Sequence, residues 1–200
     1  MRKPRLLGPA FLIRYVDDAV IVGSNEHDAG RVMDVLSQRL DRFALTLHPE
    51  KTGPVDFRRP RHRPGNGGAF PPPETFDFLG MTHMWATTRK KRWGVKRKTA
   101  TDRFSRALKK VAQWCRRNRH MSIPEQHKAL SLKLRGHYNY YGVIGNLSSV
   151  WRFYWRVIET WRRWLLRRSN RSSVWWSWMR SILKRHPLPL PSCTRPVVST

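Results

Sequence analysis

The sequence Phe11-Leu-Ile-Arg-Tyr-Val-Asp-Asp-Ala-Val-Ile-Val22 sets two adjacent carboxylates between two apolar, β-favouring runs. This pattern predicts a β-hairpin with Asp17 and Asp18 at its tip. Carboxylates are unfavourable inside a strand, and a divalent metal would explain the pair because Mg²⁺ prefers hard oxygen ligands. Two such ions about 4 Å apart can activate an attacking hydroxyl and stabilise a leaving pyrophosphate. The alternative is an ordinary turn that contains Asp-Asp, and these residues alone do not decide between the two.

The charge of the chain is large, positive and unevenly distributed. Its 200 residues carry 40 lysines and arginines against 13 acidic residues, a net charge of +27. Residues 1–88 hold 12 basic and 10 acidic residues, whereas residues 89–168 hold 23 basic and 3 acidic residues. The first part is therefore expected to be an ordinary fold with an acidic site. The second is expected to bind nucleic acid, the usual polyanionic partner of such a charge.

The cysteines and the hydropathy exclude several protein classes. Cys115 and Cys193 are the only cysteines, and their wide separation gives neither a zinc-finger spacing nor a disulfide framework. This fits a reducing compartment, and a cytoplasmic location is expected. No apolar run reaches the roughly 18 residues of a membrane-spanning helix, so no membrane partner is expected. Gly8 and Pro9 interrupt the apolar residues after the basic N-terminus, which argues against a signal peptide.

Residues 1–88 predict a mixture of strands and one helix. A helix start near Asn25 is followed by apolar residues at helical spacing. These are Ala29, Val32, Met33, Leu36, Leu40 and Phe43. Residues 45–47 predict a short strand and residues 76–87 another, whereas the Pro- and Gly-rich residues 58–73 predict an irregular linker. The fold class expected is α+β, in which an antiparallel hairpin or sheet carries a helix on one face.

Beyond about Thr101 the apolar pattern becomes helical and predicts an all-α basic bundle. Ser122 and Glu125 have the spacing of a capping box at the start of the second helix, and Gly136 within it would let a neighbour approach closely.

A third helix is predicted to present Trp151, Trp155 and Trp161 on its apolar face, where we expect them in the core. Arginines project from a different face of that helix, namely Arg152, Arg156, Arg163 and Arg167. Residues 171–186 predict a fourth helix, and the Pro-rich residues after it predict disorder.

The basic segment 89–98 predicts a turn or hairpin and contains the best candidate for base stacking. Trp93 lies there outside any apolar stripe, which suits stacking on unpaired RNA bases. Neighbouring cations are further candidate RNA contacts, although each one taken singly is better explained as a solvated side chain. They are Lys96, Arg97, Lys98, Arg103, Arg106, Lys109 and Lys110. As a cluster they predict RNA binding that weakens steeply with salt, because it depends on phosphate neutralisation.

The order of the motifs along the chain resembles a known enzyme family. The motifs are Tyr15-Val-Asp-Asp18, Leu47-His-Pro-Glu-Lys-Thr52, Phe76-Asp-Phe-Leu-Gly80 and Leu134-Arg-Gly-His-Tyr-Asn-Tyr-Tyr-Gly142. The first three resemble the last sequence blocks of a reverse-transcriptase palm. The fourth, with the Trp- and Arg-rich helix after it, resembles the maturase or thumb domain of group II intron-encoded proteins. The resemblance covers about residues 10–170.

The resemblance implies an RNA-directed DNA polymerase that also binds its intron RNA to assist splicing. In the complete enzyme, Mg²⁺-dependent nucleotidyl transfer would use a primer–template and deoxynucleoside triphosphates. Asp17 and Asp18 match the catalytic aspartates that help to hold two Mg²⁺ ions. Tyr15 and Val16 match positions that contact the primer end and the template–primer backbone. Lys51 could act as a general acid for the leaving pyrophosphate, or be a solvated turn residue.

The same resemblance implies that Phe78, Leu79 and Gly80 form the strand and turn that support the primer strand. The expected organisation is the C-terminal part of a palm over 1–88, a maturase-specific, thumb-like RNA-binding domain over 89–170, and a helix with a Pro-rich tail over 171–200. The parent enzyme would work in a cytoplasmic ribonucleoprotein with group II intron RNA.

The sequence departs from the family pattern before Asp17. A complete reverse transcriptase has a fingers region and an earlier palm strand with a third metal-binding aspartate, which the 16 residues before Asp17 cannot supply. The two-metal site is therefore expected to be incomplete, and the chain alone is expected to lack polymerase activity. A complementing N-terminal fragment would be a further partner. The alternatives are a non-catalytic RNA-binding splicing factor, a decayed gene remnant, or a general basic protein in which Asp17-Asp18 is accidental.

Overall fold

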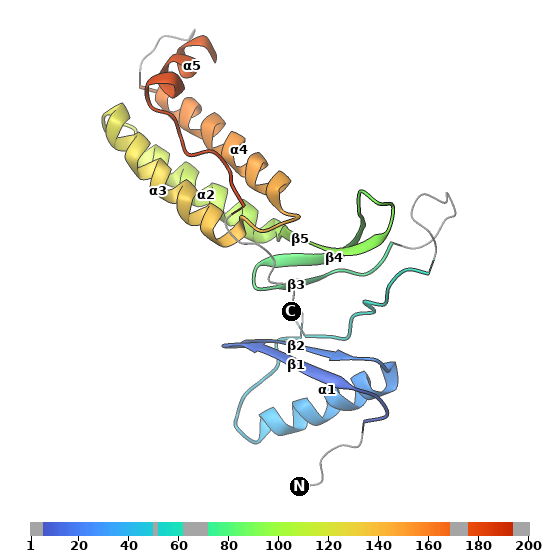
Figure 1. The fold of residues 1–200 in the computed structure, drawn as a ribbon. Coiled ribbons are helices and arrows are strands. Elements are labelled where there is room, and N and C mark those ends of the chain that lie inside the picture. The colour runs from blue at the N-terminus through green and yellow to red at the C-terminus, as the bar shows by residue number, and fades with distance from the viewer. Residues whose placement is uncertain (1–5, 50–51, 62–71, 169–175, 194–200) are drawn as a thin grey trace. The chain divides into compact units, whose positions relative to one another are not determined.

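The computed structural model describes residues 6–49, 52–61, 72–168 and 176–193 (Figure 1). Its fold is mixed α+β, as the sequence predicts. The elements are β1 (Ala10–Tyr15), β2 (Asp18–Gly23), α1 (Glu26–Asp41), β3 (Phe76–Phe78), β4 (Met81–Thr87), β5 (Trp93–Thr99), α2 (Thr101–Arg117), α3 (Ile123–Tyr141), α4 (Leu147–Leu166) and α5 (Trp176–Arg185).

The chain divides into two compact units. The N-terminal unit comprises Met1–Leu79 with Met84–Gly94, and the helical unit comprises Gly80–His83 with Val95–Thr200.

The N-terminal unit begins with the predicted hairpin. β1 pairs antiparallel with β2, and Tyr15 lies opposite Asp18 at the tip. α1 follows at once, because the side chain of Asn25 caps the helix by accepting a hydrogen bond from the His27 amide at 2.9 Å. The acidic pair therefore lies at the end of a hairpin that leads directly into a helix, as predicted.

Asp28, in the first turn of α1, fixes the residues that precede β1. One of its carboxylate oxygens accepts hydrogen bonds from the amides of Leu7, at 2.7 Å, and Gly8, at 3.1 Å. The side chain is buried, and these two donors offset part of the cost of removing a carboxylate from water. The helix and the start of the hairpin are thus joined through one acidic side chain.

α1 ends at Asp41, before the last apolar residue of the predicted stripe. The amides of Phe43 and Leu45 both donate to the carbonyl of Leu40, at 2.9 and 3.1 Å, and so close the helix. Phe43 is exposed as a result. The prediction of a strand over 45–47 was wrong, because the Leu45 amide is used to end the helix and these described residues pair with no strand.

β3, β4 and β5 form a three-stranded sheet in that order. The sequence predicted one strand over 76–87, but a two-residue turn of Leu79 and Gly80 divides it into β3 and β4. Both turn residues have positive φ, 50° and 70°, as a type I′ turn requires. The predicted basic turn before β5 is present, and the Thr88 amide closes it by donating to the Arg92 carbonyl at 2.8 Å.

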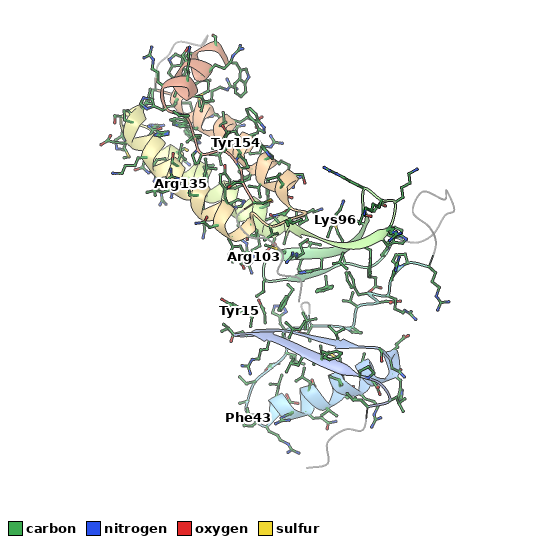
Figure 2. The ribbon with its side chains drawn as sticks, viewed as in Figure 1. Tyr15, Phe43, Lys96, Arg103, Arg135 and Tyr154 are labelled. Atoms are coloured by element: carbon green, nitrogen blue, oxygen red, sulfur yellow. The ribbon has the colours of Figure 1, made fainter. Side chains whose placement is uncertain are left out.

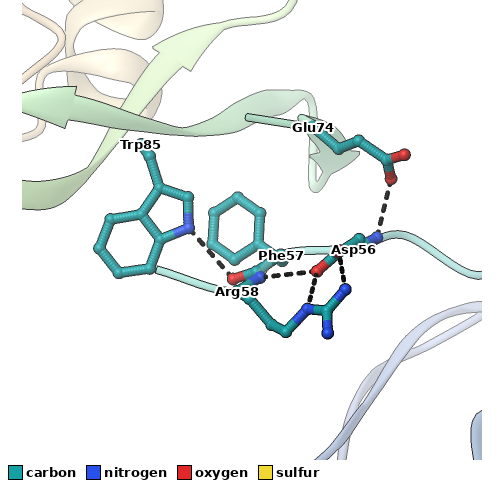
Figure 3. A network of polar contacts seen from close by, with 5 residues as sticks. All are labelled: Asp56, Phe57, Arg58, Glu74 and Trp85. Carbon is teal, nitrogen blue, oxygen red and sulfur yellow. Dashed lines mark hydrogen bonds and ion pairs between the residues drawn. The ribbon is translucent and has the colours of Figure 1, made fainter. Parts of the chain in front are cut away.

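Residues 52–61 lack regular secondary structure, yet aromatic contacts hold them in the N-terminal unit (Figure 3). The ring of Phe57 stacks on Trp85 with centroids 5.6 Å apart. The carbonyl of Phe57 accepts a hydrogen bond from the Trp85 indole N–H at 3.1 Å. The predicted linker is therefore irregular but anchored at its start, and its residues 62–71 lie outside the described part of the chain.

Polar contacts secure the same segment on the other side of Phe57. The Asp56 amide donates to the Glu74 carboxylate at 2.7 Å, and Arg58 forms an ion pair with the Asp56 carboxylate (Figure 3). The hydrogen bonds from Arg58 lower the pKa of Asp56 to about 2. These groups are exposed, so their contribution is to orientation more than to stability.

The helical unit is built on three long helices. α4 packs against both α2 and α3 (Figure 1). α3 starts at the predicted capping box, in which the Ser122 amide donates to the Glu125 carboxylate at 2.9 Å and the Glu125 amide donates to the Ser122 hydroxyl. The core between the helices is apolar. Its buried residues include Val111, Cys115, Leu130, Leu134, Tyr138, Val150, Phe153, Val157, Ile158, Trp161 and Leu165.

The buried face of α4 is rotated from the one that the tryptophans predicted. Trp161 is fully buried, and its indole N–H donates to the Gln126 side chain at 2.7 Å. Trp151 packs at the edge of the core. Trp155 is 52% exposed, so its predicted place in the core was wrong. The buried stripe passes through Val157 and Trp161, which turns Trp155 toward solvent.

The predicted disorder of the Pro-rich tail was wrong for residues 187–193. Together with His186, which follows the end of α5, they form a segment that we call the strap. The strap runs without regular structure back along α3 (Figure 1). The Tyr138 hydroxyl donates to the Pro189 carbonyl at 3.1 Å, and the His127 ring bonds the Pro187 carbonyl at 2.9 Å. Residues 194–200 lie outside the described chain. α5 and the strap add Met179, Ile182 and Leu188 to the core.

Candidate nucleic-acid interface

The tip of the first hairpin holds the acidic pair in a strained turn. Val16 and Asp17 form the two-residue loop, and Asp18 is the first residue of β2. Of the two loop residues only Val16 has a positive φ, 54°, which is the backbone of a type II′ turn. Glycine is preferred at that position, and a β-branched residue there is strained. Strained backbone concentrates at functional sites, and this turn is a candidate site because the strain lies next to two adjacent carboxylates.

The side chains of the tip are open to solvent. Tyr15, Val16, Asp17 and Asp18 are all exposed, and Val16 keeps 67% of its surface accessible (Figure 2 labels Tyr15). The motif is therefore accessible to a ligand and is not used to pack the N-terminal unit.

Asp17 and Asp18 offer the oxygen ligands that Mg²⁺ prefers, but two carboxylates alone do not complete its coordination shell. Mg²⁺ is commonly held by one or two carboxylates together with waters and substrate phosphates. Within the described ranges, no cluster of three or more His, Cys, Asp or Glu side chains is arranged to hold a metal ion. The pair can supply part of a coordination shell, and further oxygen ligands would have to come from a substrate or another chain.

The remaining positions matched to the palm have evident structural roles. Phe78 is half-buried at the end of β3, and Leu79 forms the following turn with Gly80. The Gly80 carbonyl accepts the Ala100 amide at 3.0 Å, and a Cβ on Gly80 would lie 3.2 Å from the Tyr141 hydroxyl oxygen. Their predicted support of a primer strand stays a prediction. Lys51 lies outside the described residues.

The hairpin also exposes large apolar side chains on both of its faces. Neighbouring residues along a strand point to opposite faces, yet Phe11, Leu12 and Ile13 are all exposed, as are Ile21 and Val22. Strands that are apolar on both faces are typical of the interior of a larger sheet structure. The hairpin is thus suited to being covered by further protein.

The predicted RNA-contact residues in the helical unit begin on β5 and continue onto α2 (Figure 2). Lys96 and Lys98 are exposed and Arg97 between them is half-buried, as strand alternation requires. α2 starts two residues after β5 ends, so the strand cations lead directly to Arg103 and Arg106. Lys109 and Lys110 on the same helix are also exposed.

One carboxylate moderates this basic surface. Asp102 forms ion pairs with Arg106 and, at 3.8 Å, with Arg103. Partial burial opposes the shift, but the hydrogen bonds from Arg106 and the Arg103 amide hold the pKa of Asp102 below its usual value. The two arginines are therefore oriented by Asp102, while the lysines on β5 and farther along α2 carry their charge freely into solvent.

In the described part of the helical unit, four aromatic rings lie under cations of the same chain. Arg152 lies over Phe104, Lys133 over Trp114, Arg162 over Trp176 and Arg167 over Trp164, with distances to the ring centroids of 4.6 to 5.4 Å. Trp93, the predicted stacking residue, is half-buried at the start of β5. The exposed Trp155 is the residue that sequence reasoning missed, because its spacing from Trp151 and Trp161 resembled that of a core position.

No protein-family model and no curated protein matches this sequence. Among the described residues, no helix is both long enough and apolar enough to cross a membrane.

Proposed function

We propose that the chain is the C-terminal part of a group II intron-type reverse transcriptase and maturase, and that its helical unit binds intron RNA. The observation that carries the proposal is a basic surface on a unit with its own core. Residues 89–168 hold 23 basic and 3 acidic residues, and none of the described lysines and arginines is buried. Their charge is therefore available to phosphates, whose neutralisation drives RNA binding.

The hairpin tip supports the reverse-transcriptase part of the proposal. Asp17 and Asp18 would hold Mg²⁺ together with substrate phosphates, and the bound ions would supply activation of the primer hydroxyl and stabilisation of pyrophosphate. Tyr15 and Val16 directly precede the carboxylates at the hairpin tip, and would contact the primer end and the template–primer backbone. In this role the chain contributes two carboxylates and their orientation, and it requires further ligands.

A complementing fragment would bring those ligands. The apolar faces of the hairpin support such a partner, because burial of Phe11, Leu12 and Ile13 would favour association by about 25 cal/mol for each Å² removed from water. The partner would be a reverse-transcriptase fragment with the fingers and the earlier palm strand. The combined protein would then act as an RNA-directed DNA polymerase.

A non-catalytic splicing factor is the second candidate function. It is favoured by the incomplete set of metal ligands in the described chain, since RNA binding by the helical unit needs no metal. In that case the helical unit alone would act, by stabilising the folded intron RNA.

Primer extension on an RNA template with Mg²⁺ separates these functions. The purified chain is assayed with and without an added fingers–palm fragment, and Asp17→Asn in the same mixture is the control. Activity only in the mixture, abolished by Asp17→Asn, would support the split enzyme. Inactivity in both cases together with salt-sensitive intron RNA binding would leave the splicing factor. For 6–10 phosphate contacts, affinity for intron RNA is expected to fall about 10³-fold or more between 50 mM and 200 mM salt. Absence of RNA binding at 50 mM salt would contradict both candidate functions.

A further inference from the structure

The solvent face of α4 carries a stripe of arginines around one exposed indole. Arg152, Arg156 and Arg163 follow one another at intervals of about one or two helical turns, and all are exposed. Trp155 lies on the same side, next to Arg156 and one turn from Arg152. The opposite side of the helix, through Val157 and Trp161, is buried in the core.

The exposed surface of Trp155 has no structural explanation within the helical unit. A tryptophan side chain is large and apolar, and leaving half of it in water forgoes the stabilisation that burial would give. Trp155 contacts Tyr154 edge-to-face, with centroids 5.3 Å apart. In the described part of the chain, the rings that lie under a cation are those of Phe104, Trp114, Trp164 and Trp176, so Trp155 is not among them.

The arginines beside Trp155 are held in place. The guanidinium of Arg152 lies 4.6 Å from the ring centroid of Phe104, on the neighbouring helix α2. Arg156 forms an ion pair with Glu159 at 3.0 Å. An exposed ring on the same helix face as two oriented cations is an arrangement that suits single-stranded nucleic acids, since the ring can stack on a base and the cations can neutralise nearby phosphates.

We propose that Trp155 is a stacking platform for an unpaired RNA base, and that Arg152 and Arg156, on the same helix face, bind neighbouring phosphates of that RNA strand. The inference rests on the proposed RNA-binding function and adds a specific contact to it. It also selects the ligand: a segment with unpaired bases, because a base inside a duplex presents no free face to the indole.

The test compares two single-stranded RNA oligonucleotides of about 12 nucleotides. One is oligouridine and the other is the same backbone with abasic riboses. Wild type is expected to bind oligouridine more tightly. Trp155→Ala should lose roughly fivefold to a hundredfold in affinity for oligouridine and little for the abasic strand. Trp155→Phe keeps a ring and should recover most of the loss.

Two further variants distinguish base stacking by Trp155 from two other effects, namely phosphate neutralisation by arginine and the loss of any exposed indole. Arg152→Gln should weaken binding to both strands and make the slope of log affinity against log salt shallower by about 0.7. Trp178→Ala removes an exposed indole from α5 and should leave both affinities unchanged. Circular dichroism and the urea midpoint verify that each variant is folded.

The possible failures are distinguishable. Equal binding of both strands by wild type, unchanged affinity of folded Trp155→Ala, or an equal loss with Trp178→Ala would overturn the stacking platform while leaving RNA binding intact. If wild type binds neither strand nor intron RNA, the proposed function fails and the platform fails with it.

Discussion

The side chain of Asn146 is buried and exchanges two hydrogen bonds with Thr99. The Thr99 amide donates to Asn146 Oδ1 at 2.9 Å, and Asn146 Nδ2 donates to Thr99 Oγ1 at 2.8 Å. The same Nδ2 donates to the Tyr141 carbonyl, also at 2.8 Å. One amide side chain therefore joins the end of β5, the end of α3 and the start of α4.

Asn146→Ala is expected to destabilise the helical unit by about 2–4 kcal/mol, because it leaves the buried Thr99 amide without its partner and removes one of two donors to the Tyr141 carbonyl, which keeps only the Val143 amide. Thr99→Ser is the matched control. It keeps the hydroxyl and the amide, and should cost only about 1 kcal/mol for the lost methyl group. Urea unfolding followed by tryptophan fluorescence measures both. Similar losses in the two variants would show that the hydrogen bonds are not the source of the stability.

The strap gives a second prediction, at the glycine that ends α3. A Cβ on Gly142 would lie 2.4 Å from the Tyr138 carbonyl oxygen and 2.6 Å from that of Ser192. Both are backbone atoms, so Gly142→Ala must displace the strap or the helix end. A loss of about 1–3 kcal/mol in unfolding free energy is expected.

Gly136 is the matched control, and the packing predicted for it from the sequence was wrong. A close neighbour was predicted there, but a Cβ on Gly136 would meet nothing within 4 Å. Gly136→Ala within α3 should therefore stabilise the unit by up to about 1 kcal/mol. If both alanine variants shift the urea midpoint in the same direction, the assigned packing at one of the two glycines is incorrect.

His137 predicts a loss of stability in mild acid. Its ring is buried and stacks on Phe153 with centroids 3.7 Å apart, and burial lowers its pKa to about 4. In the unfolded chain the pKa is 6.5, so between these values the unfolded state binds a proton that the folded state does not. Stability is unaffected above about pH 6.5 and falls as the pH decreases toward 4, by up to about 3 kcal/mol.

His137→Phe keeps a stacked ring and removes the titrating group. The difference in unfolding free energy between wild type and variant should therefore change across that window, whereas losses from acidic side chains such as Glu125 affect both proteins equally. A difference that stays constant from pH 7 to pH 4 would contradict the burial of a neutral imidazole.

Local signals in the sequence predicted most elements but not how their faces are used. The Asp pair between two apolar runs correctly predicted the hairpin, and Asn25 and Ser122 correctly predicted two helix starts. These predictions succeeded because a few adjacent residues decide a turn or a helix cap. The buried side of α4 was misplaced by the Trp spacing, since a helix buries whichever stripe its neighbours cover. The order of the strap was missed for a related reason. It depends on tertiary contacts: Leu188 is buried in the core, and α3 side chains bond the carbonyls of Pro187 and Pro189.

The turn at Val16 allows the strain of the candidate site to be tested directly. Val16→Gly removes the Cβ that disfavours φ of 54°, and it should raise the stability of the N-terminal unit by up to about 1 kcal/mol after the entropic cost of glycine is included. Ala19→Gly, on the adjacent strand, has no positive φ to relieve and should lower stability instead. Thermal unfolding and the rate of proteolysis within residues 10–23 measure both variants. Under the proposed polymerase function, Val16→Gly should also reduce primer extension by the complemented enzyme, because a looser tip holds Asp17 and Asp18 less firmly. A variant that is more stable and equally active would mean that the strained turn does not serve nucleotidyl transfer.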